Sequence, residues 1–367
     1  MTAANSHFIR LLTIGSLVCL MIEVASPQPI LAQEVPEKER AERHELPPLT
    51  ATVSPEEALA AIKRRAQKIL EARRAARRLK LYAEVAEVVA YENNPANAGN
   101  PRKGDTSFEE DVYLLLSKKL TPTIDWQGSY YGAYLKYLDY GDGDYTSHTL
   151  TPVKLRWQPG RMWRLESWMD LDYNYYPVVD DSSYRQIKWV GRLRQNLFGS
   201  AFHQFQYEWF DRHYTHKRAR DSGGNNTLTR RDDVRNRLRY KVGATVKQTL
   251  LTMENEYYWH DSNDNRDDFY DYQVWKITGS ASGNVTKKLY ASGSFAYEQK
   301  NYSSHKVSGI DAEARYDGKY SISTSLSYDL NDTWKLGYDY TFDHLASNDP
   351  TGEFDNAKHA FKVTAHF

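Results

Sequence analysis

Cysteine is almost absent from this sequence, and net charge is absent altogether. The single cysteine, Cys19, lies in an apolar stretch near the N-terminus, which excludes disulfides, thiol catalysis and cysteine metal sites for the rest of the chain. The formal net charge is +0, so we expect no nucleic-acid partner. Nucleotide-binding glycine patterns, nucleophile elbows and haem-attachment motifs are missing too. We therefore expect no cofactor, no metal and no enzymatic activity.

Long apolar runs are also missing. Beyond the N-terminus, none approaches the roughly 20 residues that a transmembrane helix needs, and the mean hydropathy is -0.73. Yet the chain contains 28 Tyr, 12 Phe and 9 Trp, whereas disordered chains are poor in aromatic residues. High polarity combined with many aromatic residues favours a series of short amphipathic strands.

Residues 1–32 predict a secretory signal peptide. His7 and Arg10 form its basic start, an apolar stretch of about twelve residues follows from Leu11, and cleavage is expected after Ala32. Glu23 interrupts the apolar stretch, which makes it too short for a helical anchor.

A linker and one helix should follow the signal peptide. Residues 33–53 are charged and contain prolines, which is typical of a linker. Residues 54–78 predict a helix, because Ser54 suits the N-cap, Pro55 suits the first helical position and Glu57 completes a capping box. We expect this helix in the periplasm, packed against a partner or a barrel mouth. A basic helix that plugs a pore is the alternative.

Residues 79–367 alternate between apolar and polar side chains, as strands do. Short connections and long polar connections strictly alternate between these strands, which is typical of outer-membrane barrels with short periplasmic turns and longer external loops. The pattern predicts a transmembrane, antiparallel, up-and-down β-barrel of about fourteen strands. The short turns are centred on residues 120–123, 158–161, 198–201, 246–249, 285–288 and 330–333. The two longest polar connections are expected at residues 216–233 and 301–318.

The first and last strands decide whether this barrel can close. The first should lie in "LKLYAEVAEVVAYENN", where the alternation is imperfect from Glu87 to Val89, and we expect a β-bulge there. The last is "HAFKVTAHF", which places Phe367 on the lipid side, paired with the first strand.

Aromatic residues near both ends of the strands predict two girdles around a lipid-facing band. The short-turn girdle contains Trp126, Trp157, Trp163 and Trp334. The loop girdle contains Tyr173, Trp209, Tyr257 and Tyr340.

A last strand that ends on Phe367 resembles the assembly signal of bacterial outer-membrane proteins. The fragment "AYENNPANAG" resembles the barrel opening of uncharacterised β-barrel porin families, and the strand number is similar to that in the barrel domain of surface lipoprotein assembly modifiers. The resemblance implies a Gram-negative outer-membrane barrel whose partners are outer-membrane lipid and the barrel-insertion machinery, which recognises the C-terminal strand. The chain lacks the tetratricopeptide repeats of the assembly modifiers, so lipoprotein export gains no support.

Basic residues gather on the strand faces that we expect to line the pore. Rings of Arg and Lys attract anions, so the sequence predicts a porin-like channel for polar solutes, anionic ones among them, or for polysaccharide. Arg237 and Arg239 stand out, because three arginines and a lysine on one face exceed what one neighbouring strand could neutralise. The alternative is a ladder of salt bridges that only rigidifies the wall. The expected pore-lining residues are Lys154, Arg156, Arg164, Lys188, Arg192, Arg194, Arg235, Arg237, Arg239 and Lys241, with Asp170, Asp172 and Glu254.

Three other functions stay open. An assembly, export or surface scaffold would have a filled lumen. A hydrolase at the external rim would use Asp–His pairs to activate water, from Asp211, His213 and His216 or from His260 and Asp261. The fragment "DSNDNRDD" suggests a calcium loop, but Arg266 replaces its turn glycine and Tyr272 its bidentate glutamate.

Overall fold

The computed structural model of the chain describes residues 63–65, 67–68, 78–97, 103–197, 200–265, 270–307, 310–349 and 352–367. The chain divides into two units, Met1–Arg64 and Arg65–Phe367, and the second contains the strands. Residues 63–65 and 67–68 are helical, inside the range predicted for the helix. The signal peptide, the linker and the rest of that helix lie outside the described residues. Within the described part of the chain, no helix is both long and apolar enough to cross a membrane.

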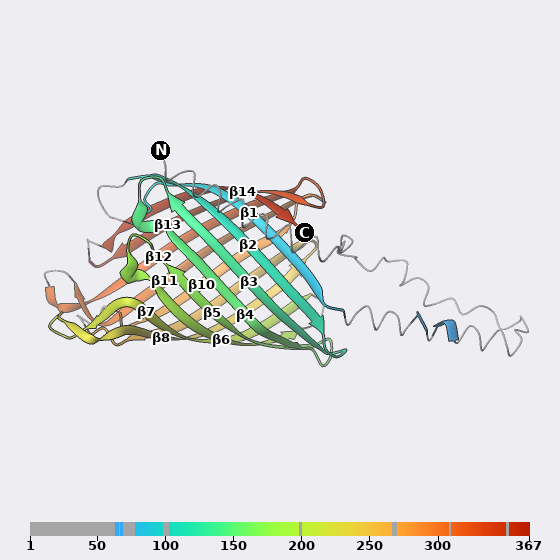
Figure 1. The fold of residues 1–367 in the computed structure, drawn as a ribbon, viewed down its shortest axis with the longest axis horizontal. Helices are drawn as coiled ribbons and strands as arrows, with labels where there is room; N and C mark the ends of the chain where they lie inside the picture. The colour runs from blue at the N-terminus through green and yellow to red at the C-terminus, as the bar shows by residue number, and fades with distance from the viewer. Residues whose placement is uncertain are drawn as a thin grey trace, which may run out of the picture. The chain divides into compact units, whose positions relative to one another are not determined.

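Fourteen antiparallel strands form one closed barrel, as predicted (Figure 1). Each strand pairs with its neighbour in the sequence, and β1 pairs with β14. Two 3₁₀ turns, η1 (Gly141–Gly143) and η2 (Asp180–Ser182), lie in the connections after β3 and β5. The strands are β1 (Lys80–Glu92), β2 (Asp105–Lys119), β3 (Ile124–Tyr137), β4 (Tyr145–Trp157), β5 (Trp163–Tyr175), β6 (Tyr184–Asn196), β7 (Ala201–Arg220), β8 (Asn226–Val246), β9 (Thr249–Ser262), β10 (Tyr272–Asn284), β11 (Leu289–Val307), β12 (Ile310–Asp329), β13 (Trp334–Ser347) and β14 (Phe354–His366).

The last residue takes part in closure. Phe367 N–H donates to the Ala83 carbonyl at 2.9 Å, and Ala83 N–H donates to the Phe367 carbonyl at 3.1 Å. The Phe367 side chain is exposed on the outer face. Pairing of the C-terminal strand with β1 is therefore confirmed.

Short turns end β2, β10 and β12 through one recurring device. In each turn the second residue turns its side chain back to accept the N–H of the first residue of the next strand. Thr121 Oγ1 accepts from Ile124 at 3.0 Å, and Thr286 Oγ1 accepts from Leu289 at 3.0 Å. Asn331 Oδ1 accepts from Trp334 N–H at 2.8 Å. Polar residues at the second turn position thus start the next strand.

Two connections predicted as long loops are mostly strand, which corrects the sequence analysis. β7 and β8 stay paired beyond the loop girdle, with Arg220 opposite Asn226, and β11 and β12 do the same, with Val307 opposite Ile310. Both hairpins contain register shifts in these extensions. Where water meets both faces of a hairpin, its residues can be polar on both faces, so the alternation that reveals a strand disappears.

The predicted bulge in β1 is wrong. The pairing of β1 with β2 runs without a break from Lys80–Ser117 to Glu92–Asp105, and the pairing with β14 is also unbroken. Alternation therefore continues through the whole strand, and Glu87 lies on the outer face between Val85 and Val89.

The outer face is a band of exposed apolar side chains. Leu155, Leu193, Phe205, Leu238 and Leu326 are each more than a third exposed, far beyond what a water-soluble barrel would leave unburied. Residues of the two predicted girdles lie on the same face, towards the two ends of the strands. This arrangement fits a wall with lipid outside.

Two glycines of β10 offer a matched test of how tightly the wall is built. A Cβ at Gly283 would meet the backbone oxygen of Gln248 and lie 3.1 Å from Thr249 Cα, whereas a Cβ at Gly279 would meet nothing within 4 Å. We expect Gly283→Ala to lower the free energy of unfolding by about 1–3 kcal/mol, because paired backbone cannot move aside. Gly279→Ala should change it by less than about 0.5 kcal/mol. Reversible urea unfolding in phospholipid vesicles measures both, and equal effects would contradict this account.

Candidate functional site

The predicted pore-lining residues all lie on the inner face of strands β4 to β9. In the register of these strands they alternate with the exposed apolar residues and stand beside one another, as Asp170 does with Lys188 and Lys241 with Glu254. Most of their charges are taken up by two clusters of ion pairs within the wall.

Glu166 is the centre of the first cluster. Its carboxylate accepts from Arg156 Nε at 2.9 Å and from Arg192 Nη1 at 3.0 Å, and Arg164 Nε lies 3.5 Å away. The glutamate side chain is only 2% exposed. One carboxylate on β5 therefore orders arginines from three strands, and Gln206 accepts a further bond from Arg192 Nε at 2.9 Å.

The second cluster neutralises the arginines of β8. Glu208 on β7 lies 3.5, 3.4 and 3.8 Å from Arg235, Arg237 and Arg239. Glu256 Oε2 on β9 lies 2.7 Å from Arg239 Nε. The sequence analysis compared the arginines with a single neighbouring strand, but β8 has two neighbours and both contribute carboxylates. The ladder of salt bridges, given above as the alternative, is thus present in the wall.

Other charged residues of this wall are paired one to one. Lys188 Nζ lies 2.8 Å from Asp170 Oδ2, and Lys241 Nζ lies 2.8 Å from Glu254 Oε2. Thr151 Oγ1 donates to Asp170 Oδ1 at 2.6 Å. These pairs leave little net charge on the residues that form them.

Of the predicted pore-lining cations, only Lys154 and Arg194 form no ion pair with a carboxylate among the described residues. Arg212 of β7, which also faces inward, has none either and donates to Gln186 Oε1 instead. Lys154 Nζ lies 4.9 Å from the ring centre of Trp168. The Arg194 guanidinium stacks on Phe202 at 3.7 Å, and its Nε donates to Asn196. Aromatic rings can hold a cation without neutralising it. These two residues therefore keep their charge available to the lumen.

Trp168 is a site residue that the sequence analysis missed. The chain has 9 Trp, and the other eight lie on the outer face. Trp168 occupies a polar phase of β5, between Glu166 and Asp170, and faces inward. Its ring lies 4.8 Å from the Arg192 guanidinium as well as near Lys154. A tryptophan at a polar phase of a strand was the signal that could have revealed it.

The inner wall of β10, β11 and β12 carries small hydroxyl side chains in the half nearer the short turns, and ion-paired charges, such as Lys276 with Glu298 and Lys319 with Asp343, nearer the loops. Ser280, Ser294 and Ser323 stand side by side across these strands, and Ser282, Ser292 and Ser325 repeat the row. The barrel interior is therefore uneven, with cations concentrated on β4 to β8 and hydroxyl groups on the later strands.

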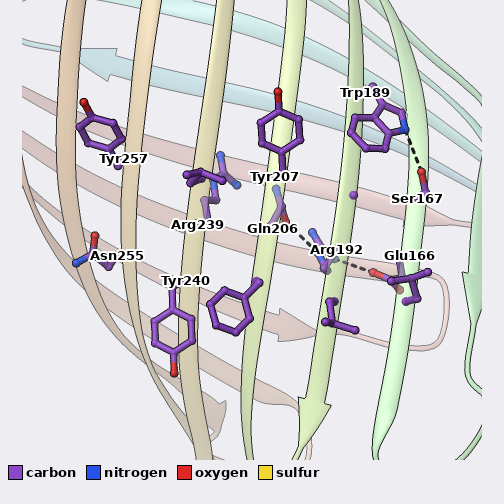
Figure 2. Close-up of a pocket in the computed structure, with 15 residues that line it drawn as sticks. Glu166, Ser167, Trp189, Arg192, Gln206, Tyr207, Arg239, Tyr240, Asn255 and Tyr257 are labelled. Atoms are coloured by element: carbon purple, nitrogen blue, oxygen red, sulfur yellow. Dashed lines mark hydrogen bonds and ion pairs between the residues drawn. The ribbon is translucent and has the colours of Figure 1, made fainter.

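One hollow beside this region opens outward. Figure 2 shows it on the outer face, with Trp189, Tyr207 and Tyr257 on one side and Tyr240 on the other. Its volume is about 610 Å³, and Gly191 contributes to its floor. Inner residues such as Arg192 border it only because the wall is one strand thick. The hollow suits an apolar occupant such as a lipid chain, so we place the functional site on the inner face.

The Asp–His residues do not form one site. His213 faces outward, with Nδ1 2.7 Å from Asp232 and Nε2 3.3 Å from Asp211. The hydrogen bond to Asp232 and the nearby Asp211 raise the pKa of His213, which favours the charged, double-donor ring over one with a free nitrogen to accept a proton. His260 points inward instead, where it stacks on Tyr272 at 4.7 Å.

The calcium alternative gains no support from the described residues. Asp264 lies 3.0 Å from Arg220 Nη2, which already neutralises it. In the ranges that the structure describes, no group of three or more His, Cys, Asp or Glu side chains could hold a metal ion. Residues 266–268 of the fragment lie outside those ranges.

Removal of the central carboxylate tests how much the first cluster contributes. Glu166→Gln leaves three arginines without a counter-charge, and we expect the free energy of unfolding to fall by about 2–3 kcal/mol. Glu254→Gln is the control, because it removes one pair with Lys241 at a site that is 21% exposed, and should cost about 1 kcal/mol or less. Urea unfolding in vesicles, followed by tryptophan fluorescence, measures both. Equal losses would show that Glu166 is no more than an ordinary lumen carboxylate.

No family profile and no curated protein matches the sequence. Among solved structures, OmpT of Vibrio cholerae is similar at 8% identity, with a TM-score of 0.49 over 80% of this chain and 98% of that one. The channel DcaP of Acinetobacter baumannii gives 9% identity and 0.47, over 80% and 98%. An anion-selective porin from Comamonas acidovorans gives 10% and 0.42, over 79% and 99%.

At such low identities and TM-scores, the assignment rests on the barrel itself. The wall is closed, its connections alternate between short turns and longer loops or extended hairpins, and aromatic girdles border an apolar outer face. The chain has the architecture of an outer-membrane β-barrel protein.

Proposed function

We propose that this barrel is a channel that passes polar solutes across the outer membrane and favours anions. The observation that carries the proposal is a group of inward cations that have no carboxylate partner among the described residues: Lys154 and Arg194, with Arg212 on the next strand. A cation inside a low-dielectric wall lowers the barrier for an anion beside it. Cations already bound to a carboxylate contribute much less.

The other predicted pore-lining basic residues are paired with carboxylates, so their role differs from that of the unpaired cations. Glu166 serves Arg156, Arg164 and Arg192, and the arginines of β8 share Glu208 and Glu256. These clusters rigidify the wall. Among the carboxylates of β4 to β6, Asp172 alone forms no ion pair with a described residue. Its Oδ2 accepts a hydrogen bond from Gln186 Nε2 at 2.8 Å. The balance of unpaired groups on β4 to β6 is therefore positive.

The solute class follows from the same wall. A small anion would pass from Lys154 to Arg194, and an acidic polysaccharide would contact several cations of β4 to β8 in succession. The serine rows of β10 to β12 offer hydroxyl groups to the polar remainder of such a solute. Trp168 holds Lys154 at the lumen surface by a cation–π contact.

A scaffold with a filled lumen is the second candidate. The extensive ion pairing favours it, because a wall stabilised in this way needs no solute to explain its charges. Conductance distinguishes the two functions.

Single-channel recording in planar bilayers tests the channel. We expect stable conductance steps with anion preference, and the double variant Lys154→Gln/Arg194→Gln should lower the anion-to-cation permeability ratio by at least about twofold. Removal of the β8 arginines is a poorer test, because it would strip Glu208 and Glu256 of their partners. Lys118→Gln, at the short-turn end of the outer face, is the control and should leave the ratio unchanged.

Two results would count against the channel. A silent bilayer from protein whose fold is verified by circular dichroism would favour the scaffold. Conductance with an unchanged permeability ratio in the double variant would keep a channel but remove its anion preference.

A further inference from the structure

Two glutamates face outward on neighbouring strands of the barrel. Glu87 on β1 and Glu110 on β2 are paired residues in an unbroken antiparallel register. Residues paired in this way have Cβ atoms about 4.5–5.5 Å apart on the same face. Glu87 is exposed and Glu110 is half-buried. The barrel thus presents two adjacent carboxyl groups to its surroundings.

This acidic pair, Glu87 and Glu110, lies inside the apolar band. Along each strand, the outward residues on both sides of the glutamate are apolar. Across the closing seam, Glu87 is opposite Val363 of β14. On the other side, Glu110 is opposite Tyr134 of β3, so the acidic pair lies in the half of the apolar band nearer the loops. The flanking residues are Val85 and Val89 on β1, and Phe108 and Val112 on β2.

Several other polar groups of the outer face have partners within the chain. Trp189 Nε1 donates to Ser167 at 3.0 Å, and Trp275 Nε1 donates to Asn255 at 3.1 Å. Over the described ranges, by contrast, neither member of the acidic pair forms a hydrogen bond or an ion pair. No other carboxylate lies on this face between the girdles of the described strands.

Lipid alone is a poor environment for this pair. A carboxylate is costly in hydrocarbon, and two like charges directly opposite each other on a sheet repel. The acidic pair contributes nothing to closure, which backbone hydrogen bonds accomplish. We propose that the outer face of β1 and β2 is a contact surface for a second membrane-embedded protein, which places a Lys or Arg side chain against Glu87 and Glu110.

Charge complementarity identifies the occupant as a different protein. Two copies of this barrel share one membrane normal, so residues at equal depth would face each other. Across the described strands, the outer face contains no Lys or Arg between the two girdles. Lys118 is paired with Trp126 at the short-turn girdle, and Lys136 is paired with Phe108, on the loop side of Glu110 and of its partner Tyr134. A second copy would therefore bring no Lys or Arg to the depth of the acidic pair.

Histidines of the outer face do not replace the missing cation. His148 Nδ1 is hydrogen-bonded to Tyr130 Oη at 2.8 Å, and its ring stacks beside Tyr173. His359 Nδ1 is hydrogen-bonded to Tyr338 Oη at 2.9 Å. Both rings are held within aromatic clusters of their own wall, so a positively charged partner must come from another chain.

Binding of a defined peptide in vesicles tests the proposal. The probe is a leucine-rich transmembrane peptide with one lysine near its middle, and the matched peptide has glutamine there. Energy transfer from the labelled barrel should report binding of the lysine peptide on the order of tenfold tighter than binding of the glutamine peptide. Glu87→Gln/Glu110→Gln should abolish the difference. Glu254→Gln removes a carboxylate from the inner face and should preserve it.

Stability of the isolated barrel provides a second measurement. Without peptide, Glu87→Gln/Glu110→Gln should shift the urea midpoint in vesicles upward, because the acidic pair has no partner there. A downward shift would mean that the glutamates serve the barrel itself and would overturn the proposal. Equal binding of both peptides would overturn it too, as would energy transfer between barrels that depends on the acidic pair, since the occupant would then be a second copy.

Discussion

Closure of the backbone hydrogen bonds between β1 and β14 is the constraint on which the rest of this structure depends. In lipid, an unpaired strand edge would leave a row of N–H and C=O groups without partners, and only a closed sheet avoids that. The seam runs from Glu92 opposite Lys358 to the pair of bonds between Phe367 and Ala83. Once it is closed, each strand has one face for lipid and one for the lumen.

A wall one strand thick couples these two faces. On β5, Leu165 and Met169 meet the outside while Glu166 and Asp170, one residue further along, point inward. Inward charges can then be neutralised only by residues on adjacent strands, and Glu166 and Glu208 each serve arginines in this way. Most of the basic residues consequently stabilise the wall, and a preference for anions would depend on the few cations that remain unpaired.

Much of the fold could be predicted from the sequence, because local alternation and turn residues determine it. The strand number, the antiparallel order and the outward position of Phe367 all follow from patterns within a dozen residues. The extended hairpins of β7–β8 and β11–β12 could not be predicted, because the sequence of a strand that is polar on both faces resembles that of a loop. Neutralisation of Arg239 by Glu256 also escaped, because it depends on the register of β8 with β9 and not on either strand alone.

The position of Glu87 shows that unbroken backbone pairing of β1 outweighs an entirely apolar outer face. A bulge between Glu87 and Val89 would have restored the apolar alternation of β1, and local amphipathicity favoured it. Such a bulge would also have shifted β1 by one residue against β14, so that side chains on one side of the seam changed faces. The register instead stays unbroken on both edges of β1. Closure of the barrel therefore places the Glu87 carboxyl on the outer face. The contacts within the barrel do not explain a carboxyl group there, whereas a partner protein would.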